Sequence, residues 1–296
     1  MRRHWQHLLF IAAKPDGISS LRCDMSLALF LQPMDWPSGE RPTLNLFDLS
    51  GRTALITGAS RGIGFAIAEA LSAAGARVIL NGRSASSLDE AALRLRQCGA
   101  QVETSVFDVT NAAQAAAAIQ LIEESIGPID ILVNNAGIQR RAPLEQFKDS
   151  DWRELMATNL DSVYYVSKAV APHMIARGRG KIINIGSVQC ELARPGIAPY
   201  TASKGAVKNL TKGMCADWAR HGLQINAIGP GYFATPLNKA LVEDPVFDEW
   251  LRKRTPAGRW GKVEDLHGVA VFLASGASDF INGQTIYVDG GILSVI

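Results

Sequence analysis

The chain has 296 residues and a mass of 31.8 kDa, and its 47% hydrophobic and 20% charged residues exclude a disordered or collagen-like protein. Its net charge is +2, from 30 Lys and Arg against 28 Asp and Glu. Proteins that bind nucleic acids concentrate basic charge on one face. The even balance therefore predicts no nucleic-acid partner.

The cysteine spacing and the lengths of the apolar runs indicate where in the cell the protein is expected. Four cysteines match neither zinc-ligand spacing nor a disulfide framework, so we expect no metal site and a reducing, cytoplasmic location; they are Cys23, Cys98, Cys190 and Cys215. No apolar run approaches the ~20 residues that cross a bilayer. The short apolar stretch at residues 8–13 is followed by charged residues, which argues against a signal peptide.

Residues 1–42 differ from the rest of the chain, because they contain four prolines and show no helical or strand period. We expect an N-terminal extension that is either a disordered arm or the result of a misplaced translation start, with Met34 as the candidate for the true one. Residues 43–296 are expected to form a single domain.

From Asn45 onward, short β-branched runs alternate with longer segments of helical period, which indicates βαβ units. Six of seven strand candidates are apolar almost throughout, as is typical of strands covered on both faces. The candidates are residues 53–57, 77–81, 101–107, 129–133, 181–185, 223–228 and 285–288. The pattern predicts an α/β fold, a doubly wound seven-stranded parallel sheet with helices on both faces.

A glycine-rich turn joins the first strand candidate to the first helix, with the sequence Gly58-Ala59-Ser60-Arg61-Gly62-Ile63-Gly64. Gly58 permits the tight turn, Gly62 lets a pyrophosphate approach the backbone, and Gly64 allows close packing of the helix on the sheet. Free N–H groups at the start of the helix favour a phosphate. The turn predicts a dinucleotide site.

The end of the second strand candidate indicates which dinucleotide is bound. An acidic residue at this point would bind the ribose 2′-hydroxyl of NAD, but the chain has Asn81-Gly82-Arg83. Arg83 can hold a 2′-phosphate through charge-assisted hydrogen bonds, and Arg61 can reach the same group. We therefore expect NADP as the cofactor.

Tyr200 and Lys204 lie four residues apart, on one face of a predicted helix. A nearby ammonium favours the phenolate, so we expect Lys204 to lower the pKa of Tyr200 and make it a general acid and base. Ser187 follows the fifth strand candidate, where its hydroxyl can bind the substrate oxygen. Asn159 can hold a water that carries protons from Lys204, or it can simply cap a helix.

In order and spacing, these motifs resemble the short-chain dehydrogenase/reductase family, from about Leu46 to the C-terminus. The resemblance implies a Rossmann fold and a catalytic tetrad of Asn159, Ser187, Tyr200 and Lys204. It also implies that Asp108 and Val109 contact the adenine, that Asn135 within Asn135-Ala136-Gly137 supports the sheet, and that residues from Pro230 and Gly231 to Thr235 contact the nicotinamide amide. Family members are usually homotetramers, which we expect here too.

A narrower resemblance, carried by residues 47–51, 134–143, 191–200 and 254–261, is to those family members that interconvert D-gluconate and 5-keto-D-gluconate. A sugar-acid substrate needs cations for its carboxylate. The candidates for substrate binding are Arg140, Arg141, Arg194 and Arg259, together with Ser187 and with Gln189 for the polyol hydroxyls. The proline-rich segment 232–259 is expected to form a lid.

Two other functions share most of these features. A 3-oxoacyl-carrier-protein reductase, or another NADPH-dependent ketoreductase, would use the same catalytic residues. A binding protein that senses NADPH without chemistry would be expected to lack part of the tetrad, whereas all four residues are present.

Overall fold

The computed structural model describes residues 45–296, so the prediction for residues 1–42 lies outside it. A seven-stranded sheet forms the centre, with the order β3-β2-β1-β4-β5-β6-β7, and all neighbouring strands are parallel. The strands are β1 (Thr53–Ile56), β2 (Arg77–Gly82), β3 (Val102–Val106), β4 (Ile131–Asn134), β5 (Gly180–Ile185), β6 (Leu223–Pro230) and β7 (Thr285–Val288).

All seven predicted strands are confirmed, with ends that differ by at most a few residues. Strands β1, β4 and β5 are buried along their whole length, which explains their continuous apolar sequences. Strand β3 lies at the edge of the sheet and is only partly buried, so its sequence includes polar residues.

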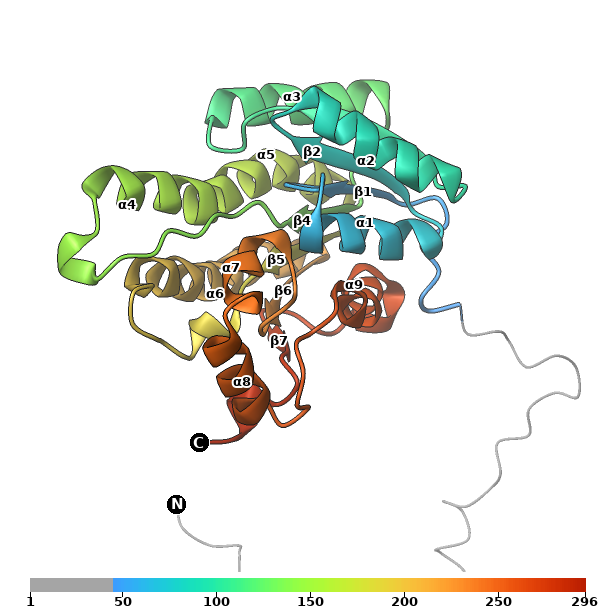
Figure 1. The fold of residues 1–296 in the computed structure, drawn as a ribbon. Helices are drawn as coiled ribbons and strands as arrows, with labels where there is room; N and C mark the ends of the chain where they lie inside the picture. The colour runs from blue at the N-terminus through green and yellow to red at the C-terminus, as the bar shows by residue number, and fades with distance from the viewer. Residues whose placement is uncertain (1–44) are drawn as a thin grey trace, which may run out of the picture. The chain divides into compact units, whose positions relative to one another are not determined.

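Helices connect the strands and cover both faces of the sheet (Figure 1). The helices are α1 (Gly62–Ala73), α2 (Ala85–Gln97), α3 (Ala112–Ser125), α4 (Asp149–Met156), α5 (Ser162–Arg177), α6 (Ala198–Trp218), α7 (Lys239–Val242), α8 (Pro245–Arg254) and α9 (His267–Ala274). Among residues 45–296, none of them combines the length and apolar character that crossing a membrane requires.

The core consists of two clusters separated by the sheet. Buried residues of α1, α2 and α9 form one cluster, and those of α3, α5 and α6 form the other. Helices α1 and α9 are far apart in sequence but pack side by side (Figure 1). A third, smaller cluster joins α8 to the segment after β5 and to the C-terminus.

The order of the strands determines where a ligand can bind. The chain runs outward from β1 to β3, then returns to β4 on the other side of β1. The loops after β1 and β4 therefore diverge and leave a crevice at the carboxyl end of the sheet, which is where such folds bind ligands.

Candidate active site

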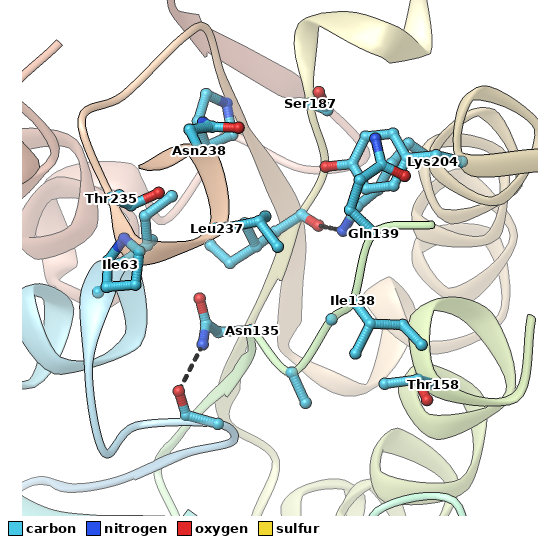
Figure 2. Close-up of a pocket in the computed structure, with 18 of the residues that line it drawn as sticks. Ile63, Asn135, Ile138, Gln139, Thr158, Ser187, Lys204, Thr235, Leu237 and Asn238 are labelled. Carbon is cyan, nitrogen blue, oxygen red and sulfur yellow. Dashed lines mark hydrogen bonds between the residues drawn. The ribbon is translucent and has the colours of Figure 1, made fainter. Parts of the chain in front are cut away.

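A cavity of about 690 Å³ lies at the carboxyl ends of the strands. It extends along the turn after β1, the loops after β2, β3, β4, β5 and β6, and the start of α6 (Figure 2). Its volume lies within the usual range for small-molecule and cofactor sites. All predicted cofactor residues except Gly64, and all predicted substrate residues except Arg259, line this one cavity.

The glycine turn forms one wall and is built for close contacts. Gly58 has a φ of +62°, and a Cβ there would lie 2.9 Å from Cα of Ala136. A Cβ on Gly64 would lie 2.4 Å from Nδ2 of Asn135. That amide donates to the carbonyl oxygens of Thr57 and Gly58, at 2.9 and 3.0 Å, and so ties the turn to the loop after β4 (Figure 2). Asn135 thus lies where the expected sheet-supporting role requires it.

Helix α1 begins at Gly62, beside Ser60 and Ile63 on the cavity wall. No side chain caps its first turn, and the turn contains no acidic residue. Its N–H groups and the positive end of the helix dipole are therefore available to an anion. This arrangement fits the diphosphate of a dinucleotide.

The loops after β2 and β3 form the end of the cavity that would hold an adenosine. Arg61 and Arg83 are exposed along this wall, which also includes Asp108 and the buried Val109. Asn81 uses its amide to bond the carbonyl oxygens of Ser105 and Phe107, so its side chain holds the two strands together. The two guanidinium groups are the parts of this wall that suit a 2′-phosphate.

The loops after β4 and β6 line the centre of the cavity. Ala136 and Gly137 contribute from the first, and Pro230, Gly231 and Thr235 from the second. Residues 230–235, expected to contact a nicotinamide, thus contribute to the same cavity as the glycine turn and the catalytic side chains.

Ser187 follows β5 by two residues and is buried. Its Oγ accepts a hydrogen bond from the backbone N–H of Gln189 at 3.1 Å. Because that bond occupies an acceptor position of the hydroxyl, its proton remains available to a substrate oxygen or to Tyr200. The strand end and the following turn, Val188–Cys190, thus fix the direction in which Ser187 donates.

Tyr200 lies in the first turn of α6 and lines the cavity beside Ser187. Burial raises the pKa of Tyr200 to about 12, and a hydrogen bond from Ser187 and the charge of Arg141 lower it by less. The pKa of Tyr200 is thus raised rather than lowered as expected, because burial outweighs the nearby positive charge. One of the cations that favour the phenolate is Arg141, which the sequence did not link to Tyr200.

Lys204 is buried one helical turn further along α6. Its Nζ donates to the carbonyl oxygen of Ile185 at 2.7 Å and lies 5.7 Å from the centre of the Tyr200 ring. Burial lowers the pKa of Lys204 to about 8. The ammonium is thus weakly stabilised in the cavity and close to the reacting groups.

Asn159 is fully buried behind the cavity, in a π-helical turn at Ala157–Asp161. Its Oδ1 accepts from the N–H of Ile138 at 2.8 Å, and its Nδ2 donates to the carbonyl oxygen of Ile138 and to Ser203. The side chain thereby fixes the loop after β4 against α6. These bonds use both hydrogens of Nδ2, while Oδ1 keeps a second acceptor position.

The four candidate arginines differ in their partners. Arg140 lines the cavity but forms an ion pair with Glu154 at 2.8 Å. Arg259 lies in a separate, smaller pocket and pairs with Asp265 at 2.6 Å, so it is not part of the main cavity. Arg141 and Arg194 both line the main cavity, and within residues 45–296 neither is in an ion pair.

The charge of Arg194 also acts on Arg141. Burial and the nearby charge of Arg194 both lower the pKa of Arg141. Two like charges that face one cavity without a carboxylate partner favour an anion between them. They are the best-placed cations for an acidic substrate.

The expected lid segment provides the outer wall only in its first part, residues 232–241. Tyr232 packs against Phe247 and Trp260, and the guanidinium of Arg194 lies 5.4 Å from the centre of the Phe247 ring. Tyr232 was expected only as part of the lid, and an aromatic residue at the start of a proline-rich segment is the local signal for such a wall.

Comparison with known proteins agrees with this geometry. Residues 58–293 match the family model described as enoyl-(acyl carrier protein) reductase. The chain belongs to the short-chain dehydrogenase/reductase family. It is accordingly an oxidoreductase that acts on a CH–OH group.

Two curated relatives and one solved structure illustrate the similarity. Gluconate 5-dehydrogenase of Gluconobacter oxydans (strain 621H) is 62% identical over 248 residues, which cover 84% of this chain and 97% of the relative. The 5-keto-D-gluconate 5-reductase of Escherichia coli (strain K12) is 52% identical over 252 residues, 85% of this chain and 99% of the relative. A gluconate 5-dehydrogenase from Burkholderia cenocepacia J2315, crystallised with NADP and tartrate, is 60% identical with a TM-score of 0.84, covering 85% of this chain and 99% of that one.

Proposed function

We propose that this protein interconverts D-gluconate and 5-keto-D-gluconate with NADP(H), using Tyr200 as the general acid and base. The observation that carries the proposal is that Ser187, Tyr200 and Lys204 share one cavity with the glycine turn and with Arg141 and Arg194, which form no ion pair within residues 45–296. The names of the relatives supply the identity of the sugar acid.

Two features support NADP as the cofactor. Arg61 and Arg83 line the adenosine end of the cavity, and no acidic residue occupies the end of β2. The similar Burkholderia enzyme was crystallised with NADP. When bound, this cofactor supplies or accepts the hydride.

The proposed mechanism assigns the proton to Tyr200. In the reduction of a ketone, Ser187 donates a hydrogen bond to the substrate oxygen and the phenol of Tyr200 donates the proton. In oxidation, Tyr200 takes the proton of the C5 hydroxyl. With the pKa of Tyr200 raised to about 12, the phenol is protonated at neutral pH and ready for reduction. The ammonium of Lys204 favours the phenolate that reduction leaves behind.

Arg141 and Arg194 are proposed to bind the carboxylate of the sugar acid. A guanidinium offers planar, bidentate hydrogen bonds to a carboxylate. Tartrate, which the Burkholderia enzyme holds in its crystal, is also a hydroxylated carboxylic acid. Arg140 and Arg259 are poorer candidates, since each already binds a carboxylate of the protein.

The test is an assay of NADPH and NADH oxidation with 5-keto-D-gluconate, 2-keto-D-gluconate, fructose and an acetoacetyl thioester. We expect the largest kcat/KM for 5-keto-D-gluconate with NADPH. A Tyr200→Phe variant should reduce turnover by at least a thousandfold while binding NADPH normally. Activity confined to the thioester would reject the proposal in favour of a 3-oxoacyl-carrier-protein reductase.

We also propose a homotetramer in the cytoplasm, as is usual in the family. Sedimentation of the purified protein at several concentrations tests the assembly. A monomer at micromolar concentration would contradict it.

A further inference from the structure

Gln189 is a buried amide that the proposed chemistry does not use. It lies in the turn Val188–Cys190, lines the main cavity, and is only 6% exposed. Its Oε1 is shielded from solvent and has no hydrogen-bond partner in the described part of the chain, residues 45–296. Nearly all buried polar atoms in proteins have a partner, so an unpaired amide oxygen on a cavity wall indicates a missing donor.

The orientation of the amide is set from its other side. Nε2 of Gln189 donates to the hydroxyl of Tyr232 at 3.4 Å. Tyr232 is in turn held by its packing against Phe247, Trp250 and Trp260. The oxygen is the amide atom without a partner, so a ligand group that satisfies it must be a hydrogen-bond donor.

The position of Gln189 relative to the chemistry is also fixed. Its backbone N–H donates to Oγ of Ser187 at 3.1 Å, so the residue is anchored directly to the side chain that binds the reacting oxygen. A substrate whose carbonyl oxygen bonds Ser187 and Tyr200 brings the neighbouring carbon atoms toward this wall. In a sugar acid, those carbons carry hydroxyl groups, which are hydrogen-bond donors.

We propose that Gln189 is a specificity-determining residue that accepts a hydrogen bond from a substrate hydroxyl adjacent to the reacting carbonyl. This inference rests on the proposed function. It adds a reason for the enzyme to prefer a keto acid that carries hydroxyl groups to one that lacks them. A site built to bond a hydroxyl rejects the analogue that lacks it, because the buried polar group is then left unpaired.

The test compares 5-keto-D-gluconate with 5-oxohexanoate, which has the same chain length, carboxylate and C5 ketone but no hydroxyl groups. Gln189→Met keeps the size of the side chain and removes both polar atoms. We expect Q189M to lower kcat/KM for 5-keto-D-gluconate at least tenfold and to leave that for 5-oxohexanoate within threefold. If turnover of 5-oxohexanoate is too slow to measure, its inhibition constant against 5-keto-D-gluconate replaces kcat/KM.

Tyr232→Phe is a matched second variant, since it keeps the aromatic ring and removes the hydroxyl that orients the amide. In this variant, the ratio of kcat/KM for 5-keto-D-gluconate to that for 5-oxohexanoate should also fall, by a smaller factor than in Q189M. The melting temperature and the dissociation constant for NADPH should match those of the wild type in both variants.

Four results would overturn the inference. An unchanged substrate preference in Q189M would show that the amide forms no hydrogen bond with a substrate hydroxyl. An equal loss with both substrates would mean that Gln189 only positions Ser187, and a weakened affinity for NADPH would assign the amide to the cofactor. A wild-type protein that is inactive with 5-keto-D-gluconate would reject both the proposed function and this inference. If the wild type is active but Q189M has an unchanged preference, only this inference is rejected.

Discussion

Lys204 donates from Nζ to the carbonyl oxygen of Ile185 at 2.7 Å, a bond that joins α6 to the end of β5 just before Ser187. The bond lies in a buried environment, which shifts the pKa values of Tyr200 and Lys204 in opposite directions. It raises the pKa of Tyr200 to about 12 and lowers that of Lys204 to about 8. Both shifts have the same cause, because burial disfavours the charged form of either group.

The first prediction concerns the pH dependence of the two reaction directions. Reduction needs a protonated Tyr200, so its kcat/KM should be level at neutral pH and fall as pH rises toward the pKa of the phenol. Oxidation needs the phenolate, so its kcat/KM should rise with pH from 7 to 10. Initial rates in both directions over that range provide the measurement. Parallel profiles would contradict Tyr200 as the proton carrier.

The second prediction concerns the stability of the wild type relative to Lys204→Met. The unfolded lysine has a pKa near 10.5, against about 8 in the fold, so the unfolded state binds more protons between these values. The free energy of unfolding is therefore lowered by the whole cost of burying the Lys204 ammonium below pH 8, and this cost declines as the pH rises. The difference between the unfolding free energy of the wild type and that of K204M should therefore shift in favour of the wild type between pH 8 and 9.5. The shift should be at most about 1.4 kcal/mol per pH unit. Denaturant titrations at several pH values test this, and a constant difference would contradict it.

The sequence predicted the strands well because burial on both faces leaves a continuous apolar pattern that is visible without coordinates. It also located the glycine turn, since the small distances at Gly58 and Gly64 leave no room for a Cβ. These features are local, or they depend on one residue type at one position.

The partners of the arginines could not be predicted in the same way. Arg140 and Glu154 are 14 positions apart and meet only because the loop after β4 packs beside α4. The direction of the Tyr200 pKa was missed for a similar reason, because it depends on how many groups from separate loops surround the phenol. The bond between Gln189 and Tyr232 joins residues 43 positions apart and has no sequence signal.

The third prediction tests the choice of dinucleotide. Arg83→Ala should lower kcat/KM for NADPH by about 10- to 100-fold, because hydrogen bonds to a charged group contribute about 1.5–3 kcal/mol. The same variant should use NADH as well as the wild type does, so NADH provides an internal control. Equal losses with NADPH and NADH would mean that Arg83 does not contact a 2′-phosphate.

The fourth prediction compares two neighbouring arginines. Arg141 has no ion-pair partner among residues 45–296, whereas Arg140 is held by Glu154. Arg141→Ala should raise the KM for 5-keto-D-gluconate at least tenfold, and Arg140→Ala should change it by less than threefold. The KM for NADPH should be unaffected in both variants. Steady-state kinetics that show equal effects would reject Arg141 as the carboxylate-binding residue.

The last prediction concerns the packing of the glycine turn. A Cβ on Gly64 would lie 2.4 Å from Nδ2 of Asn135 and 2.6 Å from the carbonyl oxygen of Gly58, so the loop after β4 and the turn must move apart in Gly64→Ala. Overpacking of this kind costs about 1–3 kcal/mol. We expect G64A to lower the unfolding free energy by about that amount and to weaken NADPH binding.

Gly213→Ala is the matched control for that prediction, because Gly213 lies inside α6 with nothing within 4 Å of the added Cβ. Replacing glycine by alanine within a helix contributes about 0.5–1 kcal/mol to stability, so G213A should be more stable than the wild type and bind NADPH equally well. Denaturant unfolding and fluorescence titration with NADPH measure both quantities. If G64A unfolds like the wild type and binds NADPH with the same affinity, the turn and the Asn135 loop are not held in contact, and Asn135 does not support the cofactor site.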